Sequence, residues 1–276
     1  MDNEKWIKAG KISAEALNYG KRLVKIDVSL LDVVNKVEAK IESLGGKPAF
    51  PVNLSINHIA AHNSPTENDK TKFKENDLVK LDLGVHVDGC IGDHACSIDL
   101  GGNKDLIDAS QEALKEAVRI IKPGVKIREI GFVIQEKIKE FNFSPVRNLS
   151  GHSISEYNIH AGMTIPNYDN GDETELEEGI IIAVEPFATN GEGKVIDGKG
   201  SDVYTILNKK NIRNENARKI LKEIEKYNGL PFAKRWITSP MKDFSFNLLE
   251  REKIIRQYPQ LIENSKGLVS QSEYTL

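Results

Sequence analysis

The clearest pattern in the chain is an alternation of apolar and polar residues that ends in a turn signal. Leu78–Val87 alternates in this way, which predicts a half-buried β-strand with Asp82 on its polar face. Asp88 and Gly89 form a strong hairpin signal, and Cys90–Leu100 is expected to return as the partner strand.

This hairpin brings two acidic residues together. With a two-residue loop, Gly84 faces Asp93 and Asp82 faces Ala95. The two carboxylates then lie on one face as diagonal neighbours, roughly 7–8 Å apart at the backbone. We therefore expect them to share one or two cations, with open space above the sheet at Gly84.

Helical spacing of apolar residues predicts two pairs of amphipathic helices, one on each side of the hairpin. The first pair covers about Glu4–Lys25 and a segment that Ser29 caps and that ends near Leu44. The second pair covers Lys104–Ile121 and a segment around Ile127–Ile138. The stretch from Phe50 to Pro65 is expected to be irregular.

The second half of the chain also contains predicted strands. Gly179–Ala188 and Gly267–Leu276 are each expected to form a strand. Between them lies a charged region with two helical patterns, Asn214–Tyr227 and Phe246–Tyr258. We interpret residues 209–261 as an inserted helical subdomain, and residues 1–208 with 262–276 as the catalytic domain.

Composition narrows the class of protein. The 276 residues include 38 basic and 41 acidic ones, a formal charge of −3, which argues against nucleic acid as the main partner. The sequence shows neither a signal peptide nor an apolar run long enough to span a membrane. Cys90 and Cys96 lie six residues apart on one predicted strand, so we expect buried apolar thiols rather than a disulfide.

All six histidines lie between positions 58 and 160. His62 precedes a turn, which would place its ring at the edge of a cleft. His58 lies four residues earlier, so a helical zinc pair is an alternative, although the glutamate of the metalloprotease pattern is absent. His152 and His160 lie in a glycine-bounded stretch without clear periodicity, which favours an active-site loop.

Glu185 interrupts the most apolar run of the chain. An unpaired charge there would cost several kcal/mol, so either an ion pair or a metal must compensate it. Pro186 removes a ladder hydrogen bond and favours a bulge or an edge beside a site. Glu273 taken alone is typical of a solvated strand residue.

These segments together resemble the type II methionine aminopeptidases of the pita-bread fold, from about Ile12 to Leu276. The matching segments, in family order, are FPVNLSINHIAAHNSP, VKLDLGVHVDGCIGD, LSGHSISEYNIHAG, AVEPFATNGEG and VSQSEYTL. The resemblance implies an α/β (α+β) fold with a pseudo-twofold antiparallel sheet flanked by helices. The charged helical region resembles the insertion that separates type II from type I enzymes.

The resemblance also implies a dinuclear metal site. Its ligands would be Asp82, Asp93, His152, Glu185 and Glu273, with Asp93 and Glu273 bridging two divalent ions. Cobalt, manganese, iron(II) and zinc all suit such a donor set. Two cations about 3.5–4 Å apart would acidify a bridging water to hydroxide, which attacks the scissile carbonyl.

Other roles follow from the same resemblance. His160 would stabilise the developing oxyanion, and His62 would contact the scissile amide. Glu185 is a candidate proton shuttle. Phe50 and Ile159 would line an apolar methionine pocket.

The expected activity is removal of initiator methionine from nascent proteins and peptides with a small second residue. We expect a cytoplasmic monomer without a membrane partner, and contact with the ribosome stays open. One alternative is an X-Pro-specific peptidase, although such enzymes normally carry a sizeable domain before the first ligand, here at position 82. Another is a non-catalytic binding protein on this fold, although such proteins lose metal ligands.

Overall fold

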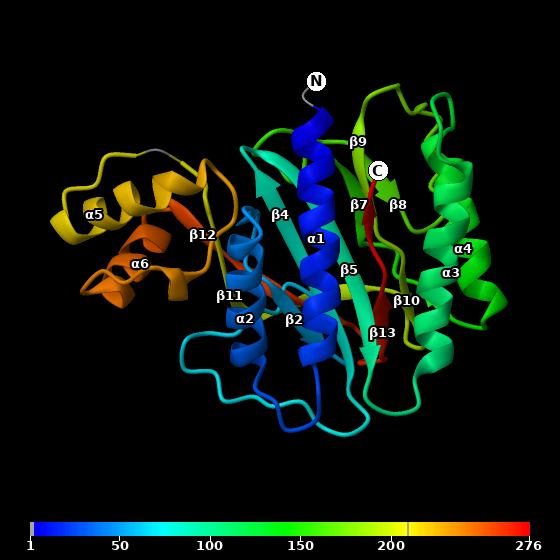
Figure 1. Ribbon diagram of the computed structural model, residues 1–276, viewed down its shortest axis with the longest axis horizontal. Coiled ribbons are helices and arrows are strands. Elements are labelled where there is room, and N and C mark those ends of the chain that lie inside the picture. Colours follow the sequence, from blue (N-terminus) through cyan, green and yellow to red (C-terminus); the bar gives the residue numbers. More distant parts are fainter. Residues whose placement is uncertain (1–2, 209) are drawn as a thin grey trace.

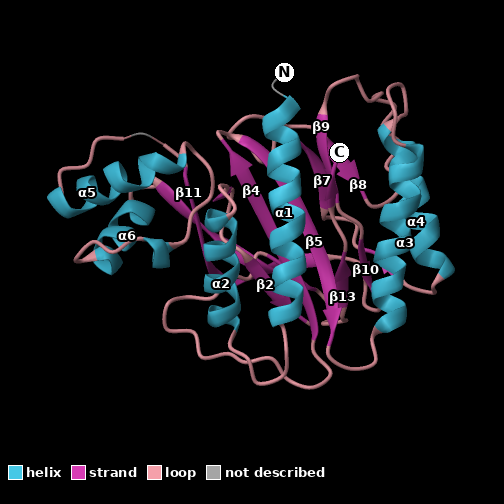
Figure 2. Cartoon of the chain, in the orientation of Figure 1, coloured by secondary structure: helices cyan, strands magenta, loops and turns pink. Residues whose placement is uncertain are grey.

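Four long helices lie on one side of the molecule and cover its strands (Figures 1 and 2). The computed structural model describes residues 3–208 and 210–276. The first helix pair is α1 (Asn3–Leu23) and α2 (Leu30–Ser43), and the second is α3 (Lys104–Ile120) and α4 (Ile127–Glu140). All four predicted helices are confirmed, and the Ser29 hydroxyl accepts a hydrogen bond from the Asp32 amide.

The predicted hairpin is also confirmed. β4 (Leu78–Val87) pairs antiparallel with β5 (Cys90–Asp99), with Asp82 opposite Ala95 and Gly84 opposite Asp93. The prediction of a half-buried strand is wrong, since β4 is buried on both faces. Helix α1 packs on one face, and β13 contacts β4 as well. Even Lys80 is fully buried, with Nζ donating to the Asn57 carbonyl at 2.7 Å.

The chain after α2 forms three short strands, and two of them, β2 (Asn53–Ile56) and β3 (Ile59–Ala61), lie within Phe50–Pro65, where an irregular stretch is predicted; that prediction is therefore wrong for these residues. β1 (Lys47–Pro48) and β2 both pair with β4. β3 pairs instead with β12. Strands this short carry too few residues to show a period, and pairing with β4 and β12 stabilises them.

In the second half, two expected strands are each broken in two. β9 (Ile181–Val184) and β10 (Phe187–Thr189) are separated at Glu185, and β13 (Val269–Gln271) and β14 (Tyr274–Thr275) at Glu273. The first break follows from Pro186, which has no amide hydrogen for a ladder. The fragments join different sheets, in the orders β13-β10-β6 and β14-β9-β7-β8. The remaining strands of these sheets are β6 (Ser144–Pro145), β7 (Ser150–Ile154) and β8 (Thr164–Pro166).

The charged region forms α5 (Glu215–Ile224), two 3₁₀ turns (Glu225–Tyr227 and Lys234–Trp236) and α6 (Lys242–Arg251). The predicted helix Phe246–Tyr258 is wrong at its C-terminal end. Lys253 adopts the left-handed conformation, and β12 (Ile255–Glu263) follows, paired with β11 (Val195–Ile206). The apolar residues after α6 have helical spacing, but this segment forms a strand because it pairs with β11.

Strand β12 crosses the proposed boundary of the insertion at residue 261. Residue 209, the proposed first residue of the insertion, and residues 1 and 2 lie outside the described part of the chain.

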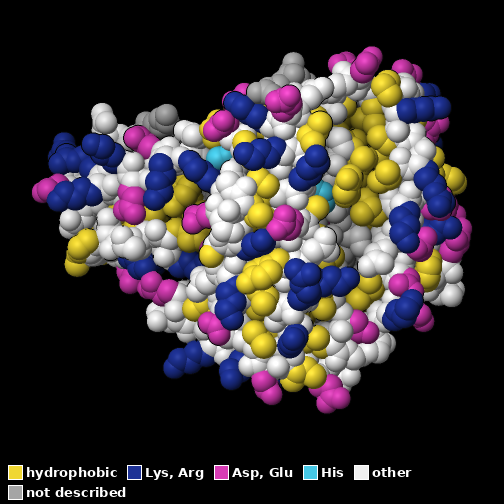
Figure 3. Space-filling view, viewed as in Figure 1, with side chains coloured by type: hydrophobic (Ala, Val, Ile, Leu, Met, Phe, Trp, Pro, Cys, Tyr) yellow, Lys and Arg dark blue, Asp and Glu magenta, His cyan; other side chains and the backbone are white. Residues whose placement is uncertain are grey.

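The apolar clusters of the described residues include one under α1 and α2, one under α3 and α4, and one within α5, α6 and β12. On the face shown in Figure 3, Lys and Arg side chains are interspersed with Asp and Glu. Cys90 and Cys96 are not joined by a disulfide, as predicted, and burial raises the pKa of Cys96 to about 12. None of the helices in the described ranges is both long and apolar enough to cross a bilayer.

A buried ionic cluster fastens the helical region to the rest of the fold. Arg235, with 5% of its side chain exposed, pairs with Glu38 on α2 and with Asp202 on β11. The same guanidinium donates to the Ser64 hydroxyl at 3.0 Å. Glu38 also accepts from the Trp236 indole at 2.8 Å. Four distant segments therefore meet at one cation.

Replacing Arg235 with Met should lower the free energy of unfolding by about 3–5 kcal/mol, because two carboxylates then stay buried without their cation. Urea denaturation measures this change. The matched control is Arg251→Met, whose side chain is 74% exposed and pairs only with Glu252; its effect should stay below about 1 kcal/mol. Equal effects of the two substitutions would contradict the anchoring role.

Candidate active site

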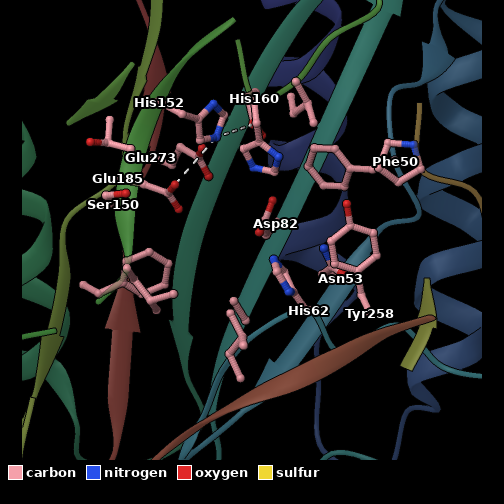
Figure 4. Close-up of a pocket in the computed structure, with 18 of the residues that line it drawn as sticks. Phe50, Asn53, His62, Asp82, Ser150, His152, His160, Glu185, Tyr258 and Glu273 are labelled. Atoms are coloured by element: carbon pink, nitrogen blue, oxygen red, sulfur yellow. Dashed lines mark ion pairs between the residues drawn. The ribbon is translucent and has the colours of Figure 1, made fainter. Parts of the chain in front are cut away.

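One cavity of about 380 Å³ gathers every residue proposed for the site. These residues are Phe50, His62, Asp82, Asp93, His152, Ile159, His160, Glu185 and Glu273. They come from strands and loops of both halves of the chain, and Figure 4 shows most of their side chains converging from opposite walls. Residues far apart in the sequence therefore share one site.

Four carboxylates and one imidazole form the polar end of this cavity. His152 Nε2 lies 3.7 Å from Asp93 Oδ2 and 3.7 Å from Glu185 Oε1. One ligand atom each of Asp93, His152 and Glu273 lie within 4.8 Å of one another. Asp82 lies beside them (Figure 4). Among the described residues, the ion-pair partner of Glu185 is His152 and not a Lys or Arg, so no permanently charged cation compensates this buried acid.

The backbone explains how the acids reach the cavity. Asp82 and Asp93 are diagonal neighbours on β4 and β5, as the hairpin predicts. Glu185 and Glu273 occupy the two strand breaks, where the chain leaves one sheet for another. Ala95 and Glu273 exchange backbone hydrogen bonds of 3.4 and 3.0 Å, and the Thr275 hydroxyl bonds the Asp93 backbone at 2.7 and 2.9 Å. The last strand is thereby tied to the hairpin.

Gln271 links the acids to one another. Its amide nitrogen lies 3.5 Å from Asp82 Oδ2, 3.4 Å from Glu185 Oε2 and 3.2 Å from Glu273 Oε2. An amide carries two N–H groups for these three acceptors. It therefore orients the carboxylates without supplying the positive charge that they lack.

Burial dominates the electrostatics of the acids. Desolvation raises the pKa of Asp82 to about 7. Desolvation together with the neighbouring acids raises the pKa of Asp93, Glu185 and Glu273 well above the usual range. Four ionised carboxylates cannot stay together in such a site unless cations neutralise them.

The donor set fits a divalent metal. Asp82 Oδ1 and Asp93 Oδ1 are buried and have no hydrogen-bond partner among the described residues. Carboxylate oxygens with one imidazole suit transition-metal ions, which would also supply the missing charge. The polar end of the cavity is therefore a candidate metal centre.

The histidines occupy two positions around the acids. His152 lies on β7, so the expectation of a loop is wrong for this residue, because β7 is paired on both sides by β8 and β9. His160 lies in the loop after β7 and meets the His152 ring edge-on at a centroid distance of 4.5 Å. Burial lowers the pKa of His152 to about 3 and also lowers that of His160. Both imidazoles are therefore neutral near pH 7.

His62 follows β3 on the opposite wall of the cavity. Its φ of +61° is the left-handed conformation, which is strained for a residue with a side chain. The ring contacts Tyr258 edge-on at 5.5 Å, and burial lowers its pKa to about 4. His58 lies in the turn between β2 and β3 and not on a helix, so the alternative of a helical zinc pair is wrong.

The apolar end of the cavity contains residues that the sequence did not single out. The space expected above Gly84 is filled by Phe50: a Cβ at position 84 would lie 2.4 Å from the Phe50 ring. Asn53, Val203, Pro231 and Tyr258 also line the cavity. Asn53 could have been found only from the β2–β4 register, which the sequence does not show.

Comparisons with family models, curated proteins and solved structures all indicate the same family. Residues 4–217 match the metallopeptidase family M24. The chain is 47% identical over 274 residues to a methionine aminopeptidase of Archaeoglobus fulgidus, which covers 99% of this chain and 94% of that protein. It is 45% identical over 282 residues to a methionine aminopeptidase of Thermococcus onnurineus, and the alignment covers 100% of this chain and 96% of that protein. The crystal structure of methionine aminopeptidase from Rickettsia prowazekii matches with a TM-score of 0.71 at 25% identity. The match covers 100% of this chain and 93% of that one. This match confirms the predicted fold.

The raised pKa values predict an unusual pH dependence of the metal-free protein. The ordinary pKa is 3.8 for Asp82 and 4.5 for the two glutamates. In the folded protein the pKa of Asp82 is about 7, and those of Glu185 and Glu273 are raised well above 4.5. Between these limits the folded state binds more protons than the unfolded state, so stability should increase as the pH falls from about 7 towards 4.5. Thermal unfolding in EDTA measures this trend, and Mn²⁺ should weaken it. A metal-free protein that loses stability over this interval would contradict the assignment.

Proposed function

The chain belongs to the methionine aminopeptidases of metallopeptidase family M24, and we propose that it is a type II enzyme that removes initiator methionine from nascent proteins and peptides. A small second residue is the expected preference. The observation that carries the proposal is the meeting of four acids and His152 beside an apolar wall that includes Phe50 and Ile159. The polar end fits a metal-assisted reaction, and the apolar end fits a methionine side chain.

The proposed ligands are Asp82, Asp93, His152, Glu185 and Glu273, holding two divalent ions. When bound, the ions would supply an acidified water as nucleophile and would polarise the scissile carbonyl. The family resemblance implies that Asp93 and Glu273 would be shared by both ions, and one ligand atom of each lies within 4.8 Å of the other and of His152. Gln271 contacts three of these acids and would help to orient them for the ions.

The remaining polar groups act on the substrate. Neutral His160, close to His152, donates to the carbonyl oxygen as negative charge develops there. His62, on the opposite wall, contacts the scissile amide. Glu185, which lies beside His152 at the polar end of the cavity, would carry the proton of the attacking water to the leaving nitrogen.

The type II assignment rests on the helical region that lies between Glu185 and Glu273. Through Arg235 this region is anchored next to the cavity, and three of its residues, Pro231, Tyr258 and Leu261, line the cavity wall. We propose it as the insertion of the type II enzymes. The presence of all five proposed ligands argues against a binding protein that has lost them. The curated relatives, which carry the methionine aminopeptidase name at 45–47% identity, argue against an X-Pro peptidase.

The first test is substrate choice. The purified protein, loaded with Mn²⁺ or Co²⁺, should release methionine from Met-Ala-Ser and leave Ala-Pro intact. Chromatography of the products measures both reactions. Release from Ala-Pro alone would support an X-Pro peptidase, and metal binding without either activity would support a binding protein.

The second test separates metal binding from chemistry. Asp93→Asn removes the charge of a proposed shared ligand, so it should weaken metal binding by at least about tenfold, as measured by calorimetry with Mn²⁺. His62→Ala and His160→Ala should keep metal affinity and lower kcat by about 10²- to 10³-fold. Equal metal loss in all three variants would contradict these roles.

A further inference from the structure

Ser97 is a buried polar residue of the hairpin to which the proposed site gives no role. It lies on β5 four positions after Asp93, and the alternation of a strand directs both side chains to the same face. Only 2% of Ser97 is exposed, and it is not among the residues that line the cavity. Any role of Ser97 in the site must therefore act through a neighbouring residue.

That neighbour is Gln271 on β13. The Ser97 hydroxyl donates to the Gln271 carbonyl at 2.8 Å and accepts from the Gln271 backbone amide at 2.8 Å. On its other side β13 pairs with β10, so the hydroxyl takes the place that a further strand would fill. Gln271 is fully buried, and without Ser97 both of its backbone groups would lose this partner while staying buried, which is costly.

The last strand comes closer to the hairpin as it approaches the acids. β13 lies beside β5 (Figure 1), and at Gln271 the Ser97 side chain bridges the two backbones. Two residues later Glu273 bonds directly to the backbone of Ala95, at 3.4 and 3.0 Å. The Ser97 hydroxyl therefore sets the spacing between the strands one step before the acid.

Gln271 carries this spacing into the site. Its side-chain nitrogen lies 3.5, 3.4 and 3.2 Å from oxygens of Asp82, Glu185 and Glu273. We propose that Ser97 is a positioning residue of the candidate metal centre. By holding the Gln271 backbone, its hydroxyl determines where the Gln271 amide and the Glu273 carboxylate lie relative to the other acids. This step rests on the proposed function, in which the acids hold divalent ions.

Metal binding tests this role without relying on turnover. Ser97→Ala removes the hydroxyl and leaves Gln271 and Glu273 free to shift, so the affinity for Mn²⁺, measured by calorimetry, should fall about 10- to 100-fold. The visible absorption of the Co²⁺-loaded protein, which reports the geometry of the ligands, should also change. Ser97→Thr retains a hydroxyl and should keep the wild-type affinity and spectrum.

Ser201→Ala is the matched control. Ser201 is also buried, and its hydroxyl likewise bonds both backbone groups of one residue: it accepts from the Ser64 amide at 2.9 Å and donates to the Ser64 carbonyl at 3.4 Å. Neither of these two serines lines the cavity. Because this substitution removes an equivalent pair of hydrogen bonds, it should lower the melting temperature and leave the Mn²⁺ affinity and the Co²⁺ spectrum unchanged.

A second substitution, Ser97→Cys, covers the case that the alanine variant does not fold. A thiol has a similar shape but makes only weak hydrogen bonds, so this variant should also lose Mn²⁺ affinity. Wild-type Mn²⁺ affinity in the folded Ala and Cys variants would overturn the proposal. An equal loss of affinity in Ser201→Ala or in Ser97→Thr would also overturn it, since general destabilisation or side-chain volume would then be the cause.

Failure of the proposed function is visible in the wild-type protein instead. A wild-type protein that binds Mn²⁺ but does not release methionine from Met-Ala-Ser would contradict the proposed function, whereas the Mn²⁺ affinities of the variants would still decide the role of Ser97. A wild-type protein that binds neither Mn²⁺ nor Co²⁺ would overturn both proposals.

Discussion

Mutual repulsion among buried carboxylates is the constraint on which this structure depends. Asp82, Asp93, Glu185 and Glu273 lie in one desolvated space with His152 as their nearest basic side chain. Gln271 offers them hydrogen bonds but no charge. The fold therefore holds these acids in an arrangement that is electrostatically unfavourable by itself, and hydrophobic packing of the two helix-covered halves provides the stability that keeps it in place.

The backbone meets this constraint by breaking strands where acids must turn inward. A continuous strand directs alternate side chains to opposite faces, and it cannot deliver Glu185 and Glu273 to one point from two sheets. The breaks at Glu185 and Glu273 allow the flanking fragments to join different sheets. Thr275 and the Ala95–Glu273 bridge then fix the last strand against the hairpin. Irregular backbone thus occurs where the chemistry requires it.

The substrate end of the cavity has a different origin. Phe50 is held against Gly84 by close packing. Tyr258, from the charged helical region that Arg235 anchors to α2 and β11, lies next to Phe50. His62 contacts Tyr258, and Asn53 lies nearby. The proposed metal ligands are therefore placed by strand pairing, whereas the shape of the proposed methionine pocket depends on a tertiary contact between segments nearly 200 residues apart, such as Arg235 and Glu38.

Local sequence determined the four helices, the hairpin and the diagonal placement of Asp82 and Asp93, because periodicity and turn residues act over a few positions. The family resemblance named the remaining proposed site residues, although spacing alone could not bring His152, Glu185 and Glu273 together. Tertiary structure alone decided the strand breaks, the conversion of the end of a predicted helix into β12, the burial of both faces of β4, and the position of Asn53 opposite Asp82. These features arise from pairing between distant segments, and that pairing energy exceeds the local preferences that the sequence displays.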